Sequence, residues 1–499
     1  MSLHRVRLVC FALLVLFALF APVARAQRNV ENSAESAHYR IESLPVPDGV
    51  SLEVGGLGFS GDTLYVTTRR GEIWSLRPAS GKNKDGEGSW KLFASGLHEV
   101  LGVLVNGKGD LVIAQRPELT RVRDTDRDGR ADRFETLTQG FGLSGNYHEY
   151  HFGPVRDGKG NLFGTLNLAW VGHGGSSVPY RGWAYKLTPS GEFVPFASGL
   201  RSPSGIAISP DGDLFVTDNQ GDFWATSPLL HVREGKFFGH PSSLRWEKGY
   251  QGIEDTFELP MESFQERRTL PVAWFVYGVL GHAPSQPIWD QAPKGMFGPF
   301  QGQMFVGDQT KSMITRVVLD RVGGEYQAAL IPFRQGFGSG IVRMVQGPDH
   351  KVYVGGTDRG WGAVGGRPYA LERLVFTGKA PFEMHSVKLT ETGFDVTFTQ
   401  PVDPASLEGD SGVSVSHHGY NYWKTYGSPH VGTTSIPKEQ IQITVSLDRL
   451  HAVIKLPELL TGRVYTIALP GARNAGGAPL VHATAYYTLI RKLGAGEIR

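Results

Sequence analysis

The sequence predicts an all-β protein, with a six-bladed β-propeller over residues 45–377 followed by an immunoglobulin-like β-sandwich over residues 378–491. Three observations lead to this prediction. A turn followed by a short strand recurs with the period of propeller blades, and the strand pattern changes after residue 377. Glycine is abundant, at 65 of 499 residues, about twice its usual share, which suits short strands joined by tight turns.

The repeat consists of a turn rich in Gly, Asp or Asn and a run of β-forming residues, as in "SPDGDLFVTDNQ" from Ser209. An apolar residue follows each turn, at Leu64, Leu111, Leu162, Leu214, Met304 and Val352. Successive spacings are 47, 51, 52, 90 and 48 residues. Four of them match a propeller blade, and the longer one leaves room for an insertion at about 231–299.

A helical solenoid is the alternative fold for such a period. It is disfavoured because the apolar residues alternate or form short β-branched and aromatic runs flanked by glycine, which is typical of strands. In a propeller the loops of all blades converge at the mouth of a central channel. We therefore expect the functional site at that mouth.

The first 26 residues are typical of a secretory signal peptide. Basic residues precede an apolar run of 14 residues from Leu8 to Ala21, and "ARA" supplies a cleavage site before Gln27. The run is shorter than the roughly 20 residues of a membrane-spanning helix. We expect export to the periplasm or the medium, no transmembrane segment in the mature chain, and a short N-terminal segment at 27–44 before the propeller.

Charge and cysteine content exclude several classes of function. Removal of the signal peptide leaves 47 basic residues against 48 acidic ones, which argues against a nucleic-acid partner. The single cysteine, Cys10, lies in the signal peptide, so the mature chain has no disulfide, zinc–thiolate site or cysteine nucleophile.

The C-terminal part has alternating strands such as "QIQITVSLDRLHAVIKLP" and a size of about one hundred residues, as in immunoglobulin-like modules. The chain then ends in a short tail at 492–499. One segment, "SHHGYNYWKTYGSPH" from Ser416, concentrates histidine and aromatic residues. Because no further ligand lies at a useful spacing, we interpret it as an interdomain contact or a carbohydrate-facing loop rather than a metal site.

The stretch "DTDRDGRADRFE" predicts a structural calcium site. A twelve-residue calcium loop supplies oxygen ligands from positions 1, 3, 5, 7, 9 and 12, with glycine at position 6. The corresponding residues are Asp124, Asp126, Asp128, the carbonyl of Arg130, Asp132 and Glu135. No paired helices flank the loop, so we expect a clip on an inter-strand loop rather than a sensor; the alternative is a solvated acidic turn.

Several motifs together point to one family. "GNYHEYHFGPVRDGKGNLF" holds His148 and His151, "GLRSPSGIAISPDGDLFVTDNQGD" follows, and "GKFFGHP" begins at Gly235. Over most of residues 45–377 this sequence resembles the glucose and sorbosone dehydrogenases, soluble quinoproteins with six-bladed propellers. "PVAWFVYG", "TDRGWG" and "LVFTGKAPFEM" resemble an exported bacterial, sorbosone-dehydrogenase-like subgroup.

The resemblance implies a role for several residues. His148 matches the general base, and a neutral imidazole suits that task. Arg201 matches the arginine that lies against the quinone, and Lys311 and Arg343 lie near basic residues that meet the carboxylates of pyrroloquinoline quinone (PQQ). Asn219 and Gln220 lie in the turn that holds the cofactor-bridging calcium in the family.

The sequence also departs from the family at several positions. Leu200 and Ser202 replace a histidine and an asparagine of the family motif, and Arg343 is one position out of register, which on a strand turns a side chain to the other face. In "TDRGWG", a charged pair and an aromatic residue suit a sugar ring, and we expect Asp358, Arg359 and Trp361 to contact the substrate.

These observations predict an exported dehydrogenase that oxidises a sugar or polyol by hydride transfer to bound PQQ and passes electrons to a periplasmic acceptor. Two alternatives stay open. One is a carbohydrate-binding propeller without catalysis. The other is a metal-dependent lactonase or lyase, for which the repeat turns offer the carboxylates of Asp218, Asp222, Asp308 and Asp358.

Overall fold

The computed structural model describes residues 33–79, 88–170, 177–409 and 411–494. The predicted signal peptide and residues 495–499 of the predicted tail lie outside this part. The described residues form an all-β protein, as predicted. Their short helices are α2 (Ser33–Ser36), α3 (Glu262–Gln265) and the 3-10 helices η1 (Pro241–Trp246), η2 (Thr256–Glu258), η3 (Pro404–Leu407) and η4 (Lys438–Gln440). None of these helices has the length and hydropathy needed to span a membrane.

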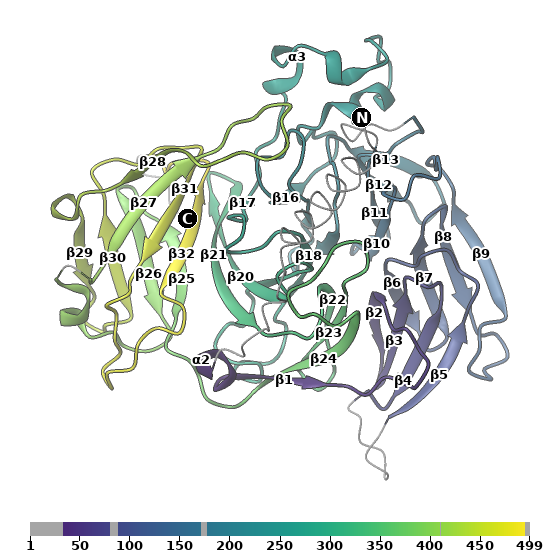
Figure 1. Ribbon diagram of the computed structural model, residues 1–499, viewed down its shortest axis with the longest axis horizontal. Coiled ribbons are helices and arrows are strands. Elements are labelled where there is room, and N and C mark those ends of the chain that lie inside the picture. Colours follow the sequence, from purple (N-terminus) through teal and green to yellow (C-terminus); the bar gives the residue numbers. More distant parts are fainter. Residues whose placement is uncertain (1–32, 80–87, 171–176, 410, 495–499) are drawn as a thin grey trace, which may run out of the picture.

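Six groups of four antiparallel strands follow one another in the described chain, and we number them sheets 1 to 6 (Figure 1). Sheet 1 contains β2 (Val54–Ser60), β3 (Thr63–Thr68), β4 (Ile73–Arg77) and β5 (Ser89–Ala94). Sheet 2 contains β6 (Val103–Gly107), β7 (Asp110–Gln115), β8 (Glu118–Arg123) and β9 (Arg133–Thr138). Sheet 3 contains β10 (His151–Arg156), β11 (Leu162–Leu166), β12 (Trp183–Leu187) and β13 (Phe193–Ala197).

The remaining three sheets follow the same plan. Sheet 4 contains β14 (Gly205–Ile208), β15 (Leu214–Thr217), β16 (Pro228–Val232) and β17 (Ala273–Trp274). Sheet 5 contains β18 (Pro284–Trp289), β19 (Met304–Asp308), β20 (Met313–Val322) and β21 (Glu325–Gln335). Sheet 6 contains β22 (Ile341–Gln346), β23 (Val352–Thr357), β24 (Tyr369–Phe376) and β1 (Tyr39–Ser43).

The first strands of the six sheets form a closed ring. Strand β2 contacts β6, β6 contacts β10, and the contacts continue through β14, β18 and β22 back to β2. Apolar side chains fill the space between neighbouring sheets, because alternate residues of a strand face opposite sides. In β7, Leu111 and Ile113 pack toward sheet 1, whereas Val112 and Ala114 pack toward sheet 3. We call this assembly the ring.

The positions aligned in the sequence repeat occupy equivalent places in the ring. Each is the first or second residue of the second strand of its sheet, and each is buried; they are Leu64, Leu111, Leu162, Leu214, Met304 and Val352. The turn before each of them joins the first strand to the second. The repeat therefore marks the hairpin at the inner edge of every sheet.

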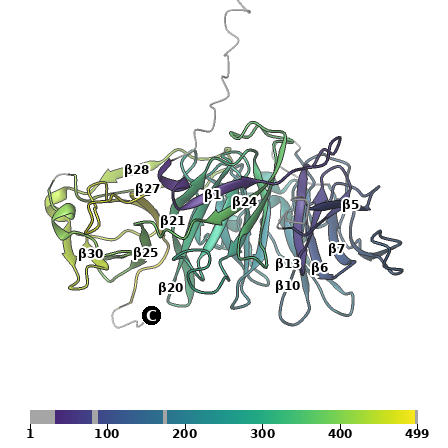
Figure 2. The same cartoon turned by 90° about the horizontal axis from the view of Figure 1, so that it is seen from below.

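An N-terminal strand completes sheet 6, which the sequence did not indicate. Strand β1 pairs with β24, from Tyr39 opposite Phe376 to Ser43 opposite Glu372, and Figure 2 shows the two strands side by side. The predicted propeller began at residue 45 and left this strand in the N-terminal segment. No turn of the repeat precedes β1, and its partner is more than 300 residues away in the sequence, so the periodicity could not reveal the pairing.

The long spacing in the repeat comes from a segment inside sheet 4. Residues 233–272 leave the sheet after β16 and return at β17, and they include η1, η2 and α3. Phe237, Leu244, Phe257 and Phe264 form a small core there with Phe223. The observed segment is shorter than the predicted insertion at 231–299, because β17 and β18 already belong to sheets 4 and 5.

Two packed sheets follow the ring. One contains β25 (Met384–Leu389), β26 (Gly393–Phe398), β30 (His451–Lys455) and β29 (Gln442–Val445). The other contains β32 (Thr484–Leu489), β31 (Arg463–Ala468), β27 (Ser414–Gly419) and β28 (Val431–Ser435). We call the pair the C-terminal sandwich. Strand β32 also pairs with β21, so one sheet of the sandwich continues sheet 5 of the ring.

A buried ionic network joins the N-terminal segment, the ring and the sandwich. The imidazole of His482 contacts Glu383 (Nδ1 to Oε1, 2.5 Å) and Glu35 (Nε2 to Oε1, 3.0 Å). Glu35 also lies 3.4 Å from Nη1 of Arg334 in β21. Burial opposes the charge on His482, but the attraction of Glu383 and hydrogen bonds to both glutamates outweigh it and raise its pKa to about 9.

This network predicts a loss of stability at alkaline pH. Because the folded-state pKa of His482 lies above its ordinary value, its contribution is complete below pH 6.5 and disappears as the pH rises to about 9. The lost free energy of unfolding is on the order of 3 kcal/mol. Thermal melts between pH 6 and 9.5 should show the melting temperature of the wild-type protein falling over this window.

The variant His482→Gln should be less stable than the wild type at pH 6. Its melting temperature should decrease much less than that of the wild type as the pH rises to 9.5. A matched control is His451→Gln, which alters a half-exposed histidine paired with Asp395 on the surface of the sandwich. The control should melt like the wild type. Parallel pH profiles for His482→Gln and the wild type would contradict this role.

Candidate functional site

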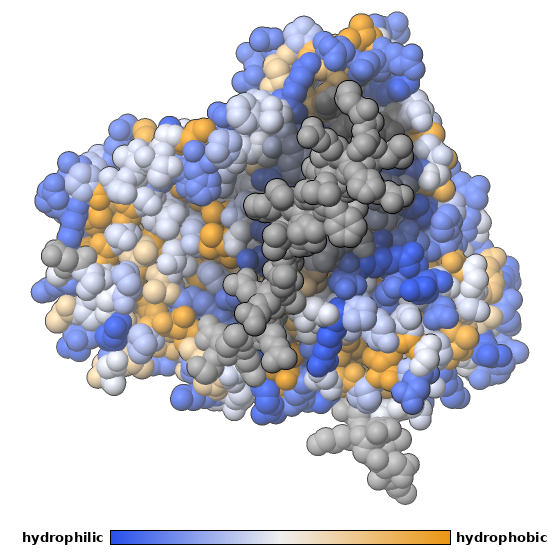
Figure 3. Space-filling view, viewed as in Figure 1, coloured by the Kyte–Doolittle hydropathy of each residue, from blue (hydrophilic) through white to orange (hydrophobic). Residues whose placement is uncertain are grey.

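A pocket lies at one end of the ring, where the segments that enter the inner strands meet those that leave the second strands. It encloses about 610 Å³, including its open mouth. All sheets contribute to its lining, which consists of Arg69, Leu101, His148, Tyr150, Phe152, Asn167, Ser202, Ser204, Asn219, Ala283, Ser285, Gln309, Val342, Arg359, Gly360 and Trp361. No carboxylate is among these described residues. In the view of Figure 3, the part of the ring surface that remains visible carries many hydrophilic residues.

Polar side chains at the ends of second strands hold the pocket segments in place. Asp218 accepts hydrogen bonds from the backbone N–H groups of Arg201 (2.8 Å) and Ser202 (2.7 Å). Asp308 of sheet 5 accepts equivalent bonds from His282 and Ala283, both 2.8 Å. Burial raises the pKa of each aspartate to about 6, although these hydrogen bonds oppose the rise. Both carboxylates therefore fix backbone rather than bind a ligand.

His148 lies just before β10 and is 4% exposed. Its Nδ1–H donates to the carbonyl of Leu168 (2.8 Å), so the neutral ring carries its lone pair on Nε2. That atom lies 3.3 Å from Oγ of Ser202. Burial lowers the pKa of His148 to about 4, and the nearby charges of Arg201 and Arg116 act in the same direction. The ring is therefore a neutral acceptor at neutral pH.

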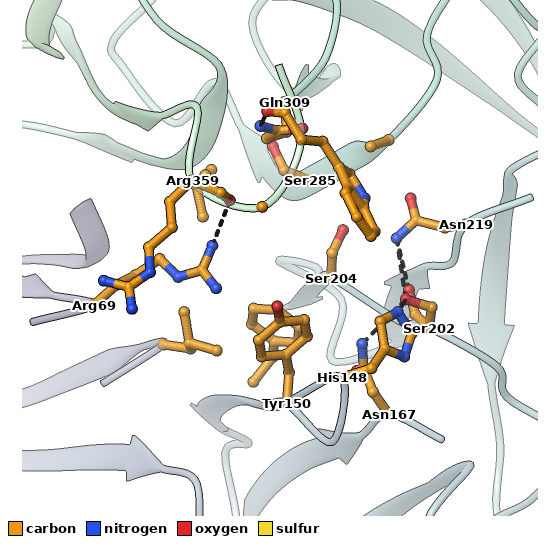
Figure 4. Close-up of a pocket in the computed structure, with 16 residues that line it drawn as sticks. Arg69, His148, Tyr150, Asn167, Ser202, Ser204, Asn219, Ser285, Gln309 and Arg359 are labelled. Carbon is orange, nitrogen blue, oxygen red and sulfur yellow. Dashed lines mark hydrogen bonds between the residues drawn. The ribbon is translucent and has the colours of Figure 1, made fainter. Parts of the chain in front are cut away.

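Ser202 connects the polar side chains beside His148 (Figure 4). Asn167 donates from Nδ2 to Oγ of Ser202 (3.1 Å), and Asn219 donates from Nδ2 to its carbonyl (2.8 Å). The carbonyl oxygens of both asparagine side chains are buried without a partner among the described residues, as is Oγ of Ser285. Unsatisfied buried groups are costly, so hydroxyl groups of a ligand that reached these oxygens would stabilise this wall of the pocket.

Arg201 is buried beside this wall. Its Nη1 donates to the carbonyl of Gln220 (3.1 Å), whereas Nε and Nη2 have no hydrogen-bond partner among the described residues. The guanidinium lies 5.2 Å from the ring centres of Trp170 and Tyr426. A Cβ atom on Gly221 would lie 1.9 Å from Nε of Arg201, so only glycine fits at that position. Arg201 does not itself line the pocket, and its two unpartnered donors could bind an anion or a hydroxyl group that reached them.

The opposite wall carries Arg69 and Arg359 (Figure 4). Arg69 pairs with Glu99 (2.5 Å), Arg359 pairs with Glu53 (2.7 Å), and Nη1 of Arg69 donates to the carbonyl of Arg359 (2.8 Å). Tyr150 lies between the two walls, with the guanidinium of Arg69 at 5.2 Å from its ring centre. The two arginines thus present guanidinium groups to the pocket, while the paired glutamates do not line it.

Arg343 lies below the pocket, inside the ring, and does not line it. Its guanidinium donates to the carbonyls of Ser204 (3.0 Å) and Leu101 (2.7 Å). A register shift in the pairing of β22 with β23 lies between Ile341 and Arg343, and Val342 lines the pocket instead. Burial lowers the pKa of Arg343 to about 9. Arg343 was predicted to contact the cofactor, but its hydrogen bonds instead connect it to the segments that enter the inner strands of two other sheets.

Three other predicted site residues lie near the pocket without lining it. Lys311 donates its backbone N–H to Asp308 (2.6 Å), and Gln220 donates its side-chain amide to the carbonyl of Ala225 (3.0 Å). Asp358 donates its backbone N–H to the carbonyl of Pro368. By contrast, Arg359 and Trp361 of the same motif do line the pocket. His151 lies in the core, where it contacts the hydroxyl of Tyr185 (2.7 Å).

The predicted calcium loop connects β8 and β9, the two outer strands of sheet 2. Oxygens of Asp124, Asp126 and Asp128 lie within 4.8 Å of one another, and Oδ1 of Asp124 is buried without a partner in the part of the chain that the structure describes. Asp132 instead accepts hydrogen bonds from Thr125. Three predicted ligands are therefore brought together, and the loop lies outside the pocket.

Glu135 departs from the predicted ligand set. It lies in β9 and pairs with Arg123 (2.7 Å) and Arg133 (2.6 Å). As a strand residue it faces neighbouring basic side chains rather than the turn. The twelve-residue pattern does not take account of this pairing, because the calcium loops that define it end in a helix.

Several lining residues were not predicted from the sequence, although the repeat contained a signal for them. Arg69, Asn167 and Gln309 each follow a second strand, as the predicted Asn219 does. Polar residues at this point of each repeat point to the mouth of the ring. Tyr150 and Ser285 belong to the segments that enter inner strands, which are less regular in sequence.

The family model described as "Domain of unknown function (DUF7133)" matches residues 79–355. The chain belongs to this family. None of the curated proteins matches it. This DUF7133 protein is similar to solved structures of sugar dehydrogenases. The soluble aldose sugar dehydrogenase of Escherichia coli, in the apo-form, is 17% identical with a TM-score of 0.48, covering 67% of this chain and 99% of that chain.

Two further structures are similar to the DUF7133 protein. The PQQ-bound aldose sugar dehydrogenase of Streptomyces coelicolor is 16% identical with a TM-score of 0.47, over 68% of this chain and 98% of that one. The PQQ domain of pyranose dehydrogenase from Coprinopsis cinerea is 13% identical with a TM-score of 0.46, over 71% and 99%. At these values the similarities do not assign an activity to this chain.

The environment of His148 predicts an unusual titration. Its imidazole should stay neutral from pH 8 down to pH 5 and gain a proton with a midpoint at about pH 4, because burial disfavours the charged ring. Nitrogen-15 NMR of labelled histidine, with His148→Gln to assign the signal, measures this directly. A midpoint near 6.5 would contradict the buried, neutral state.

Proposed function

We propose that the six sheets are the blades of a six-bladed β-propeller, that the C-terminal sandwich is an immunoglobulin-like module, and that the pocket oxidises a sugar or polyol. The observation that carries the proposal is His148. A buried imidazole whose Nε2 lone pair faces a polar pocket is suited to removing a proton from a hydroxyl group. The unpartnered polar atoms around it are suited to the remaining hydroxyl groups of such a substrate.

The charge of the pocket is consistent with PQQ, which carries three carboxylates. Two arginines and no carboxylate line the described pocket, and Arg201 beside it has two unpartnered N–H donors. Arg201 would hold a carboxylate through its two unpartnered donors, because guanidinium groups bind carboxylates through paired N–H donors. Arg69 and Arg359, each paired with a glutamate, would add positive charge on the opposite wall. A quinone bound there supplies the acceptor for a hydride from the substrate carbon.

Side chains of the protein would remove the proton from the substrate and orient the substrate in the pocket. The substrate hydroxyl takes the place of the Ser202 hydroxyl at Nε2 of His148, and its proton moves to that atom as the carbon loses a hydride and becomes a carbonyl. The hydrogen bond from Nδ1 of His148 to Leu168 keeps Nε2 unprotonated before the reaction and stabilises the charged ring afterward. Asn167 and Asn219 orient the substrate through their unpartnered oxygens.

The two alternatives differ in what they require. A lactonase or lyase with a central metal ion needs converging carboxylates, but Asp218, Asp222, Asp308 and Asp358 do not line the pocket. A carbohydrate-binding protein without catalysis needs only the polar wall. It remains the second candidate, because the pocket offers hydrogen-bonding groups whether or not a quinone binds.

We also propose that Asp124, Asp126 and Asp128 hold a calcium ion that orders the loop between β8 and β9. Carboxylate oxygens are the ligands that calcium prefers. Export to the periplasm or the medium, directed by residues 1–26, is part of the same proposal, because these residues have the pattern of a signal peptide. Reduced PQQ would then pass its electrons to an acceptor in that compartment.

Replacing His148 should remove oxidation. With calcium and PQQ present, His148→Gln should lower kcat for aldose or polyol oxidation by roughly 10²–10⁴-fold, since glutamine cannot accept the proton. Reduction of an artificial electron-accepting dye measures the rate. The control His231→Gln alters a histidine on β16 that pairs with Asp213 outside the pocket and should keep wild-type activity. Full activity of His148→Gln would refute the assignment of the base.

Calcium should stabilise the chain through its acidic loop. A ligand that binds only the folded state at about 100 times its Kd adds about 2.7 kcal/mol, so calcium should raise the melting temperature by several degrees. Asp126→Asn should lose most of that rise, whereas Asp62→Asn, which alters an exposed partner of Arg77, should keep it. An equal rise in all three proteins would show that calcium acts elsewhere.

A further inference from the structure

Exposed aromatic rings surround the mouth of the pocket. Trp170 is 38% exposed, Tyr277 49%, Trp361 48% and Tyr426 53%. They come from distant parts of the sequence, in sheet 3, between sheets 4 and 5, in sheet 6 and in the C-terminal sandwich. Large apolar side chains gathered on a surface mark a binding site. We call these four residues the aromatic rim.

The sandwich contributes to this rim through the loop between β27 and β28. Figure 1 shows this yellow-green loop reaching from the sandwich toward the ring. It is docked by backbone hydrogen bonds: Phe223 N–H donates to Trp423 (3.1 Å), Gly427 N–H to Gly221 (3.0 Å) and Ser428 N–H to Ala225 (2.8 Å). The loop is therefore fixed on the turn that follows Asn219 of the pocket wall.

Docking places Tyr426 beside groups of the site. Its ring centre lies 6.4 Å from that of Trp170, and both rings lie 5.2 Å from the guanidinium of Arg201. Trp170 in turn lies 5.5 Å from the ring of His148. The aromatic rim thus begins at Trp170, next to the proposed base His148. It continues outward to Tyr426, which belongs to the sandwich loop.

The other side of the mouth is built in a similar way. Tyr277 stacks flat on His282, with ring centres 4.1 Å apart and planes 9° apart. Burial raises the pKa of Tyr277, and Tyr426 and Asp308 act in the same direction. The backbone of Trp361 is held by Gln309, whose side-chain amide donates to its carbonyl (3.0 Å).

The aromatic rings of the rim are fixed in place, have exposed faces and lie beside polar side chains, and such an arrangement can bind sugar units. A pyranose ring has C–H groups on its faces and hydroxyl groups at its edge, so it can stack on an aromatic ring while its edge binds polar side chains. A protein partner or a membrane would favour a continuous apolar surface, but Arg201, Asn219 and His282 lie among these rings.

We propose that the aromatic rim binds the inner sugar units of an oligosaccharide whose terminal unit enters the pocket, and that the sandwich loop selects for such chains. This inference rests on the proposed function in that the same pocket receives the terminal sugar. It assigns the sandwich a role in substrate selection, through Tyr426.

Calorimetric titration without PQQ tests the inference by binding alone. The probes are cello-, xylo- and malto-oligosaccharides from the monosaccharide to the hexasaccharide. For at least one series, wild-type affinity should rise with chain length. In Tyr426→Ala that rise should shrink by about fivefold to tenfold while monosaccharide affinity is unchanged. The control Phe134→Ala removes a similarly exposed ring on β9, at 48%, and should bind like the wild type.

Two results would overturn the inference: affinity that does not depend on chain length in any series, or an equal loss for Tyr426→Ala and Phe134→Ala. Trp170→Phe keeps a ring and should preserve the length dependence, which separates stacking from a general loss of folding. Failure of the proposed oxidation gives a different result. In that case binding would still depend on length and on Tyr426, but no dye would be reduced with PQQ present.

Discussion

The pairing of β1 with β24 is the constraint on which the rest of the structure depends. It supplies the outer strand of sheet 6 and joins the start of the described chain to the last sheet of the ring. Nearby, Glu35 connects α2 to Arg334 of the ring and His482 of the sandwich. The pocket needs this assembly because its lining comes from all six sheets, so any opening of the ring would separate its walls.

Burial then gives the pocket its chemical character. Carboxylates at the ends of second strands are used to hold backbone N–H groups, which leaves the described lining without negative charge. His148 is kept neutral with a defined tautomer, and Arg201 keeps two donors without partners. The hydrogen bonds that stabilise the ring therefore also produce a site with a neutral base and guanidinium groups around it. The docked sandwich loop adds an aromatic ring at the mouth of this site.

The sequence could predict what is local and repeated. The six second strands, the all-β fold and the position of His148 near the mouth came from periodicity and from a family resemblance. What it could not predict is nonlocal. The pairing of β1, the register shift beside Arg343, the ion pairs of Glu135 and the approach of Tyr426 to Arg201 depend on segments far apart in the chain, or on strand pairing that a motif does not encode.

A calorimetric titration of the folded chain with PQQ, in the presence of calcium, measures whether this pocket holds a quinone. We expect one saturable site per chain. Arg201→Leu should reduce the affinity at least about tenfold, because it removes one charge-assisted contact. Absence of binding to the folded wild-type protein would contradict the claim that this pocket holds a quinone, and the pocket would then be assigned to carbohydrate binding alone.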